Sequence, residues 1–112
     1  MPITLYHNPR CSKSRAALAL LEERGVHPRI VEYLKTPPDA AELARIVALL
    51  KMRPRDLLRP KQARDAGVDP ALADAVLIDA MVANPAVIER PIAVSDDDAR
   101  LGRPPERVLE LL

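Results

Sequence analysis

The chain has 112 residues, of which 48% are hydrophobic and 29% are charged, and its formal net charge is +1. This length and composition predict a single globular domain over residues 1–112 with a packed core. The near-neutral charge argues against a nucleic-acid partner, because proteins that bind nucleic acid usually carry a strong basic excess.

The chain has only one cysteine, Cys11, which excludes an intramolecular disulfide and a multi-cysteine zinc site. Nothing in the sequence has the paired spacing of metal ligands, so we expect no metal and no bound cofactor. The N-terminus lacks the basic and apolar regions of a signal peptide, and no apolar run reaches the roughly 20 residues that span a bilayer. These features predict a cytoplasmic protein with no membrane partner. We also expect a monomer.

The first third of the chain predicts a strand, a helix and a second strand. Alternating apolar and polar residues favour a short strand over residues 3–6. A helix is expected to begin at residue 11 or 12 and to run to about residue 24, where Gly25 stops it. Residues 29–34 are rich in β-branched side chains and predict the second strand. A β-α-β unit of this kind implies a parallel pair with a right-handed crossover.

The middle of the chain predicts a helical insertion over roughly residues 39–84. Asp39 and Glu42 have the spacing of a capping box, at the start of a helix that buries one apolar stripe. A short helical turn is expected over residues 54–58. Asp69-Pro70 predicts the start of a further helix, with proline at its first position, and this helix is expected to end with the insertion.

The last part of the chain predicts two strands and a helix. A third strand is expected within residues 87–94, around Pro91, and a fourth over residues 99–101. A helix over residues 106–112 ends the chain. The whole order is β-α-β, a helical insertion, then β-β-α. It predicts an α/β, thioredoxin-like fold with a central mixed sheet of about four strands.

Cys11 follows a predicted strand and stands at the start of a predicted helix. The partial positive charge at a helix N-terminus favours the thiolate, which is the nucleophilic form of cysteine. Arg10, Lys13 and Arg15 add positive charges nearby, and Ser14 offers a hydroxyl donor. A lone cysteine is often only a buried apolar residue, but polar residues flank this one on both sides. We therefore predict a reactive thiol at a site that also attracts an anion.

Residues 7–15, with the sequence HNPRCSKSR, resemble the HNPxCxxSR signature of glutaredoxin-coupled arsenate reductases, the ArsC-like proteins of thioredoxin-like fold. The resemblance continues in order along nearly the whole chain. Further segments that match are YLKTPP at 33–38, LLR at 57–59, LIDAM at 77–81, RPI at 90–92 and LGRP at 101–104.

The resemblance implies that Cys11 attacks arsenate or a related oxyanion and that His7 supports its thiolate. It also implies that Pro91 is the cis proline of the fold. The residues expected to bind the substrate are three arginines from distant segments and two residues of the signature: Arg59, Arg90, Arg103, Ser14 and Arg15. Arginine suits this role because its planar fork of donors matches a tetrahedral oxyanion.

Reduction takes two electrons and a second thiol, which a chain with one cysteine must obtain from outside. The resemblance implies glutathione as a co-substrate and glutaredoxin as a partner. Ser12-Lys13 stands where characterised reductases of this type often carry Gly-Thr. A reductase of another oxyanion or of glutathionylated thiols is therefore an alternative, as is a redox regulator or interaction protein of the same fold family. The CxxC switch of such regulators cannot form here, because Ser14 occupies the second cysteine position.

Overall fold

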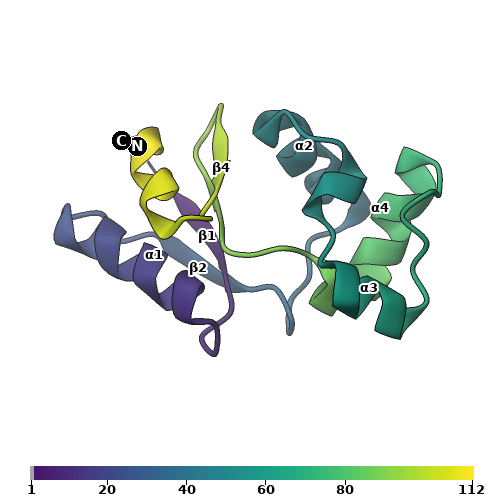
Figure 1. The fold of residues 1–112 in the computed structure, drawn as a ribbon. Helices are drawn as coiled ribbons and strands as arrows, with labels where there is room; N and C mark the ends of the chain where they lie inside the picture. Colours follow the sequence, from purple (N-terminus) through teal and green to yellow (C-terminus); the bar gives the residue numbers. More distant parts are fainter. Residues whose placement is uncertain (1) are drawn as a thin grey trace. The chain divides into compact units, whose positions relative to one another are not determined.

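The structure, a computed structural model, describes residues 2–112 (Figure 1). Its helices and strands follow in the order β1 (Thr4–His7), α1 (Ser12–Glu23), β2 (Arg29–Glu32), α2 (Ala40–Leu50), η1 (Pro54–Leu57), α3 (Pro60–Ala66), α4 (Asp74–Ala83), η2 (Pro85–Val87), β3 (Ile92–Val94), β4 (Ala99–Leu101) and η3 (Pro105–Leu111). The elements labelled η are 3₁₀ helices. No helix within the described range is long and apolar enough to cross a membrane.

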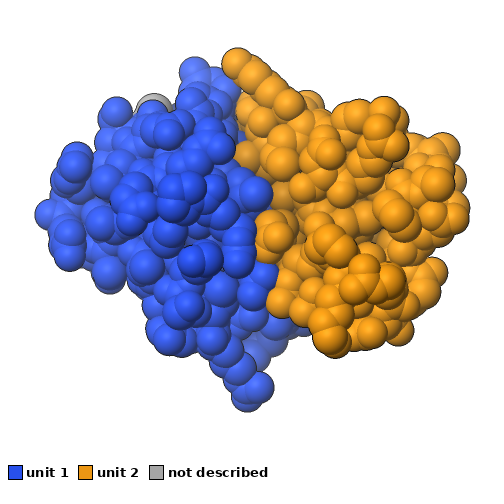
Figure 2. Space-filling model, in the orientation of Figure 1, with its two compact units in different colours: residues 1–36, 90–112 blue, residues 37–89 orange. Residues whose placement is uncertain are grey.

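The chain folds into two compact units, which Figure 2 colours separately. One contains the described residues up to Thr36 together with Arg90–Leu112, and we call it the sheet unit. The other, Pro37–Glu89, contains α2, η1, α3, α4 and η2, and we call it the helical unit. The expectation that residues 1–112 form one domain with an insertion stays a prediction.

The sheet unit is built on four strands in the order β2-β1-β3-β4. β1 and β2 run parallel, whereas β3 is antiparallel to both β1 and β4. This confirms the predicted α/β class and the mixed four-stranded sheet. The last strand lies at Ala99–Leu101, as predicted, but β3 is shorter than the expected strand and begins only at Ile92, directly after Pro91.

One face of this sheet forms the apolar core of the sheet unit. Leu5 of β1 pairs with Ala93 of β3, so their side chains share a face. The residues buried there come from two strands, two helices and the position before β1: Ile3, Leu5, Ala17, Leu21, Ala93, Val108 and Leu111. Helices α1 and η3 therefore pack on the same side of the sheet (Figure 1). This packing fixes the start of α1, where the candidate nucleophile lies.

The ends of the elements follow local hydrogen bonds. Gly25 has a φ of 75° just after α1, and its N–H donates to the Glu22 carbonyl at 2.9 Å, so it ends the helix as predicted. β2 ends at Glu32, two residues earlier than expected. The Glu32 carbonyl accepts from the amides of both Lys35 and Thr36, which turns the chain away from the sheet.

The helical unit confirms one predicted helix start and corrects another. The Asp39 carboxylate accepts from the Glu42 N–H at 2.8 Å and caps α2, as expected. The helix predicted to start at Asp69-Pro70 is wrong, because α4 begins only at Asp74. The Asp69 carboxylate accepts from the Ala71 N–H at 2.8 Å and so forms a turn instead of a helix cap.

Two further helices differ from expectation. Helix α3 was not expected from the sequence, because its seven residues bury only Ala63 and lack the apolar period that marks a helix. The last helix is a 3₁₀ helix, η3, and begins one residue earlier than expected. Val108 and Leu111 are its buried residues, and their spacing of three matches the 3₁₀ turn.

Candidate active site

Cys11 occupies the N-cap position of α1, as the sequence predicted. A tight loop brings it there from the end of β1. The Cys11 N–H donates to the Asn8 carbonyl, and the Arg10 N–H donates to the Asn8 side-chain oxygen, both at 3.0 Å. The loop between strand and helix is thus closed on Asn8, whose importance the sequence analysis missed. An asparagine before a proline is a turn signal that could have indicated it.

Ser14 and Arg15, both expected to bind substrate, hold this loop from the first turn of α1. The Ser14 hydroxyl is fully buried, accepts from the Asn8 N–H at 3.1 Å and lies 2.6 Å from His7 Nδ1. The Arg15 guanidinium donates to the Pro9 carbonyl at 3.0 Å. Both side chains therefore brace the backbone around Cys11, and a direct contact with substrate stays a prediction for each.

His7, at the end of β1, is buried and only 6% exposed. Burial lowers its pKa below the ordinary histidine value, Glu32 opposes this shift, and Arg15 adds to it. The imidazole is thus held neutral. Because the Ser14 hydroxyl already accepts from Asn8, we assign its proton to His7 Nδ1, which leaves the ring proton on Nε2.

The pKa of the Cys11 thiol lies below its ordinary value, although the residue is only 8% exposed. Burial alone would raise this pKa. The backbone amides of Ser14 and Lys13 and the charges of Arg90 and Arg103 outweigh burial and favour the thiolate. The two amides act by proximity, because the sulfur makes no formal capping hydrogen bond with the helix end.

Arg90 and Arg103 come from distant segments of the chain but belong to the same sheet unit as Cys11. Arg90 precedes Pro91, and the bond between them is cis, as the resemblance implied. A second cis bond joins Arg103 to Pro104. The Arg103 guanidinium donates to the Arg90 carbonyl at 3.2 Å, so the two segments are joined beside the thiol whose pKa they lower.

Arg59, the third predicted arginine, lies in the helical unit at the N-cap of α3. Its guanidinium donates to the Ala86 carbonyl at 3.1 Å, and its backbone N–H donates to the Val87 carbonyl at 2.8 Å. These bonds fix Arg59 against the segment that follows α4. Its part in oxyanion binding stays a prediction.

A pocket of about 220 Å³ lies beside the active-site loop in the sheet unit. One wall consists of loop residues 7–10, and the other consists of Glu32, Leu34 and Lys35. Arg10 and Lys35 give it two cationic side chains. Across residues 2–112, no three His, Cys, Asp or Glu side chains gather in a way that could hold a metal ion.

A cysteine at a helix N-terminus with a lowered thiol pKa, in a unit built on a mixed four-stranded sheet, defines a thiol protein of thioredoxin-like fold. Residues 6–111 match the family model of the ArsC family. The chain is 49% identical over 114 residues to the Escherichia coli K12 protein named "Uncharacterized protein YfgD", covering 98% of this chain and 96% of that one. Over 114 residues it is 45% identical to the "Arsenate reductase" of Neisseria meningitidis serogroup B, covering 98% and 97%.

A solved structure titled "Arsenate reductase from Vibrio cholerae" is also similar, with a TM-score of 0.93 and 45% identity. The match covers 100% of this chain and 98% of that one. The chain therefore belongs to the ArsC family, as its motifs suggested.

Proposed function

We propose that this protein is an arsenate reductase in which Cys11 is the nucleophile and glutathione and glutaredoxin supply the electrons. The observation that carries the proposal is the positive electrostatic field around the Cys11 sulfur. Two backbone amides and two guanidinium groups lower the pKa of a thiol whose burial alone would raise it. The same donors suit a tetrahedral oxyanion, so one site collects both reactants. Relatives that carry the name arsenate reductase support the choice of substrate.

The first step is attack of the Cys11 thiolate on the arsenic atom. A sulfur–arsenic bond forms, and one arsenic–oxygen bond breaks, its oxygen leaving as water after taking up protons. Arsenic keeps its oxidation state in this step. Arg90 and Arg103 bind the remaining oxygens and neutralise their charge, and the family motif implies the same role for Arg59. His7, held by its hydrogen bond with Ser14, keeps the loop in place.

The second step requires a thiol from outside, because the chain has no other cysteine. Glutathione attacks Cys11 Sγ, and the two sulfurs form a mixed disulfide while the sulfur–arsenic bond breaks. Its two electrons pass to arsenic, which leaves as arsenite. Glutaredoxin then reduces the mixed disulfide and restores the thiol. We place this cycle in the cytoplasm, where glutathione is kept reduced.

The pocket beside the loop is suited to the incoming glutathione. Arg10 and Lys35 offer cationic partners for its two carboxylates, and Glu32 offers one for its ammonium group. Lys35→Ala should therefore raise the KM for glutathione and leave the KM for arsenate unchanged. Lys61, exposed on α3, gives the matched control. An equal effect of Lys61→Ala would remove this assignment.

The proposal is tested by mixing the protein with arsenate, glutathione and glutaredoxin and following NADPH consumption through glutathione reductase. We expect arsenate-dependent consumption, and none from Cys11→Ser. Ser12→Ala, an exposed neighbour, should keep the activity and serves as the control. Absence of any arsenate-dependent consumption by the wild-type chain would overturn the proposal. Consumption with a glutathionylated peptide but not with arsenate would assign the same thiol to a different substrate.

A further inference from the structure

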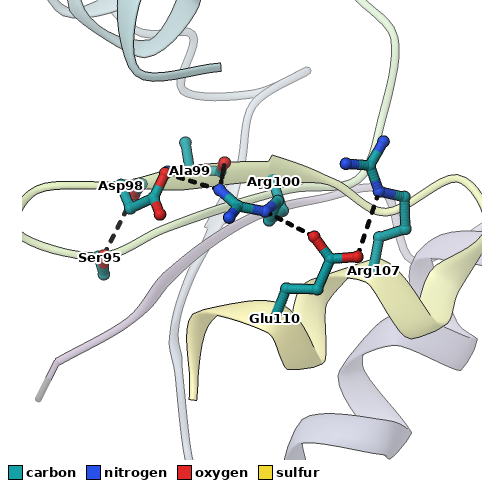
Figure 3. Close-up of polar contacts among 6 residues, drawn as sticks. All are labelled: Ser95, Asp98, Ala99, Arg100, Arg107 and Glu110. Atoms are coloured by element: carbon teal, nitrogen blue, oxygen red, sulfur yellow. Dashed lines mark hydrogen bonds and ion pairs between the residues drawn. The ribbon is translucent and has the colours of Figure 1, made fainter. Parts of the chain in front are cut away.

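A group of ion pairs joins β4 to η3 on the surface of the sheet unit (Figure 3). Arg100 Nη1 lies 2.6 Å from Asp98 Oδ1, and Arg100 Nε lies 2.8 Å from Glu110 Oε1. Glu110 Oε2 also lies 3.6 Å from Arg107 Nε. Arg100 thus binds the hairpin turn with one edge of its guanidinium and η3 with the other. We call the Arg100–Glu110 pair the β4–η3 clamp.

The arginine of the clamp is partly shielded from solvent, whereas Glu110 is 49% exposed. The Arg100 side chain is 26% exposed, whereas those of Lys35, Arg53 and Lys61 in their ion pairs are 79%, 58% and 73% exposed. Partial burial strengthens a charge pair, because less water screens it. Arg100 also donates to the Ala99 carbonyl at 2.7 Å, which fixes the direction of its side chain. The clamp is therefore able to hold a defined geometry.

The two residues of the clamp flank Arg103 along the chain. Arg100 lies three residues before Arg103, and Glu110 lies seven residues after it. Between them, the Gly102 N–H donates to the Pro91 carbonyl at 2.8 Å. A Cβ at Gly102 would lie 2.7 Å from Pro91 Cγ, so the backbone touches the proline ring. Arg103 stands in the sequence between this fixed backbone and η3, so the position of η3 bears on the direction that its side chain takes.

We propose that the Arg100–Glu110 ion pair is a positioning device that holds Arg103 in register with Arg90 beside Cys11. Val108 and Leu111 attach η3 to the core, but apolar contacts are non-directional and leave a short helix some freedom to slide. A hydrogen-bonded ion pair is directional and removes that freedom. For oxyanion binding this inference rests on the proposed function, whereas for the state of the thiol it stands independently.

The test is Glu110→Gln, with Glu106→Gln as its control. Glu106 lies on the same helix, is exposed, and loses the same charge. For each variant, iodoacetamide alkylation is followed against pH, and the KM and kcat for arsenate are measured. We expect Glu110→Gln to raise the alkylation midpoint and to raise the KM about fivefold at an unchanged kcat, which is the order that such an ion pair can supply. Glu106→Gln should change neither.

The direction of the thiol shift separates positioning from simple charge. Removal of a carboxylate leaves more net positive charge around the sulfur, which by itself lowers the thiol pKa. Displacement of Arg103 raises it. A midpoint in Glu110→Gln that is unchanged or lower than in Glu106→Gln overturns the proposal, even if the melting temperature falls. Arg100→Lys, which keeps the charge but cannot bind both carboxylates, should raise the midpoint less than Glu110→Gln. Because alkylation needs no arsenate, the alkylation midpoint tests the positioning of Arg103 even if the protein does not reduce arsenate.

Discussion

The Ser14 hydroxyl lies 2.6 Å from His7 Nδ1, and the two residues are buried together behind the active-site loop. The hydroxyl also accepts from Asn8, so a single side chain links the end of β1, the loop and the first turn of α1. In the proline-containing loop before Cys11, this connection fixes the backbone that presents the sulfur to the helix N-terminus.

Ser14→Ala should destabilise the protein and raise the pKa of Cys11. The substitution leaves the partly buried Asn8 amide and the buried His7 Nδ1 without this partner, which costs about 1–3 kcal/mol in the free energy of unfolding. It also loosens the amides of residues 13 and 14 that favour the thiolate. Urea unfolding and pH-dependent alkylation measure the two effects. Ser12→Ala, at an exposed position of the same turn, should show neither; equal effects from both variants would contradict the role of the Ser14 hydroxyl.

His7 should make the stability of the protein fall in mildly acidic solution. Its pKa is lowered in the folded state, mainly by burial, so the folded protein resists protonation that the unfolded chain accepts. As the pH falls below about 6.5, the ordinary value for the unfolded chain, stability is lost progressively until the lower folded pKa is reached. Above about pH 6.5 the stability that neutral His7 contributes is fully present.

The measurement is the free energy of unfolding as a function of pH, compared between wild type and His7→Gln. Glutamine cannot titrate but can accept from the Ser14 hydroxyl. Its curve should be flatter between neutral and mildly acidic pH, whatever its absolute stability. His27→Gln removes an exposed histidine and should keep the wild-type slope. A His7→Gln curve parallel to the wild-type curve would contradict the prediction.

Two substitutions at Arg90 should separate its charge from its shape. Arg90→Lys keeps the positive charge that lowers the pKa of Cys11 but loses the planar fork that binds two oxyanion oxygens. We expect a raised KM for arsenate with little change in the alkylation midpoint. Arg90→Ala should raise both. Arg64→Ala on α3 removes an exposed arginine of the helical unit and should alter neither. If Arg90→Lys and Arg90→Ala give the same KM for arsenate and the same alkylation midpoint, the separate roles of charge and shape at Arg90 are wrong.

Leu21→Ala should be among the more damaging core substitutions of the sheet unit. Leu21 is fully buried in the cluster that joins α1, the sheet and η3. Truncation of a leucine in such a place costs about 2–5 kcal/mol in the free energy of unfolding, because a cavity remains. Leu20→Ala, at the adjacent and partly exposed position, should cost clearly less in the same urea titration. Equal losses would show that α1 packs differently.

The sequence predicted best those features that depend on neighbouring residues. The junction of strand and helix at Cys11 was predictable, because apolar alternation ends just before a polar segment that starts a helix. Asp39 at the start of α2 was predictable for the same reason. Asp69 was misread, because an aspartate before a proline can cap a helix or close a turn, and only the surrounding structure decides between them.

Other features depend on residues that are far apart or that carry no period. α3 escaped prediction because Ala63 alone is buried. The bond between His7 and Ser14 spans seven residues and two elements, and the Arg100–Glu110 pair joins a strand to a helix, so neither follows from a local pattern. Arg90 and Arg103 were identified through family motifs and not through spacing, since one guanidinium among 17 Lys and Arg residues has no distinguishing mark.

The sheet unit draws its strands from both ends of the chain, with β1 lying between β2 and β3. On the ribosome, β1 therefore meets only β2 while the helical unit is being synthesised, and its other edge stays open until residues 92–94 emerge. Cys11 likewise lacks the charges of Arg90 and Arg103 over that period, so part of what lowers its pKa is missing. The contribution of Arg90 and Arg103 to the acidity of the thiol thus arises only once the last third of the chain has been made.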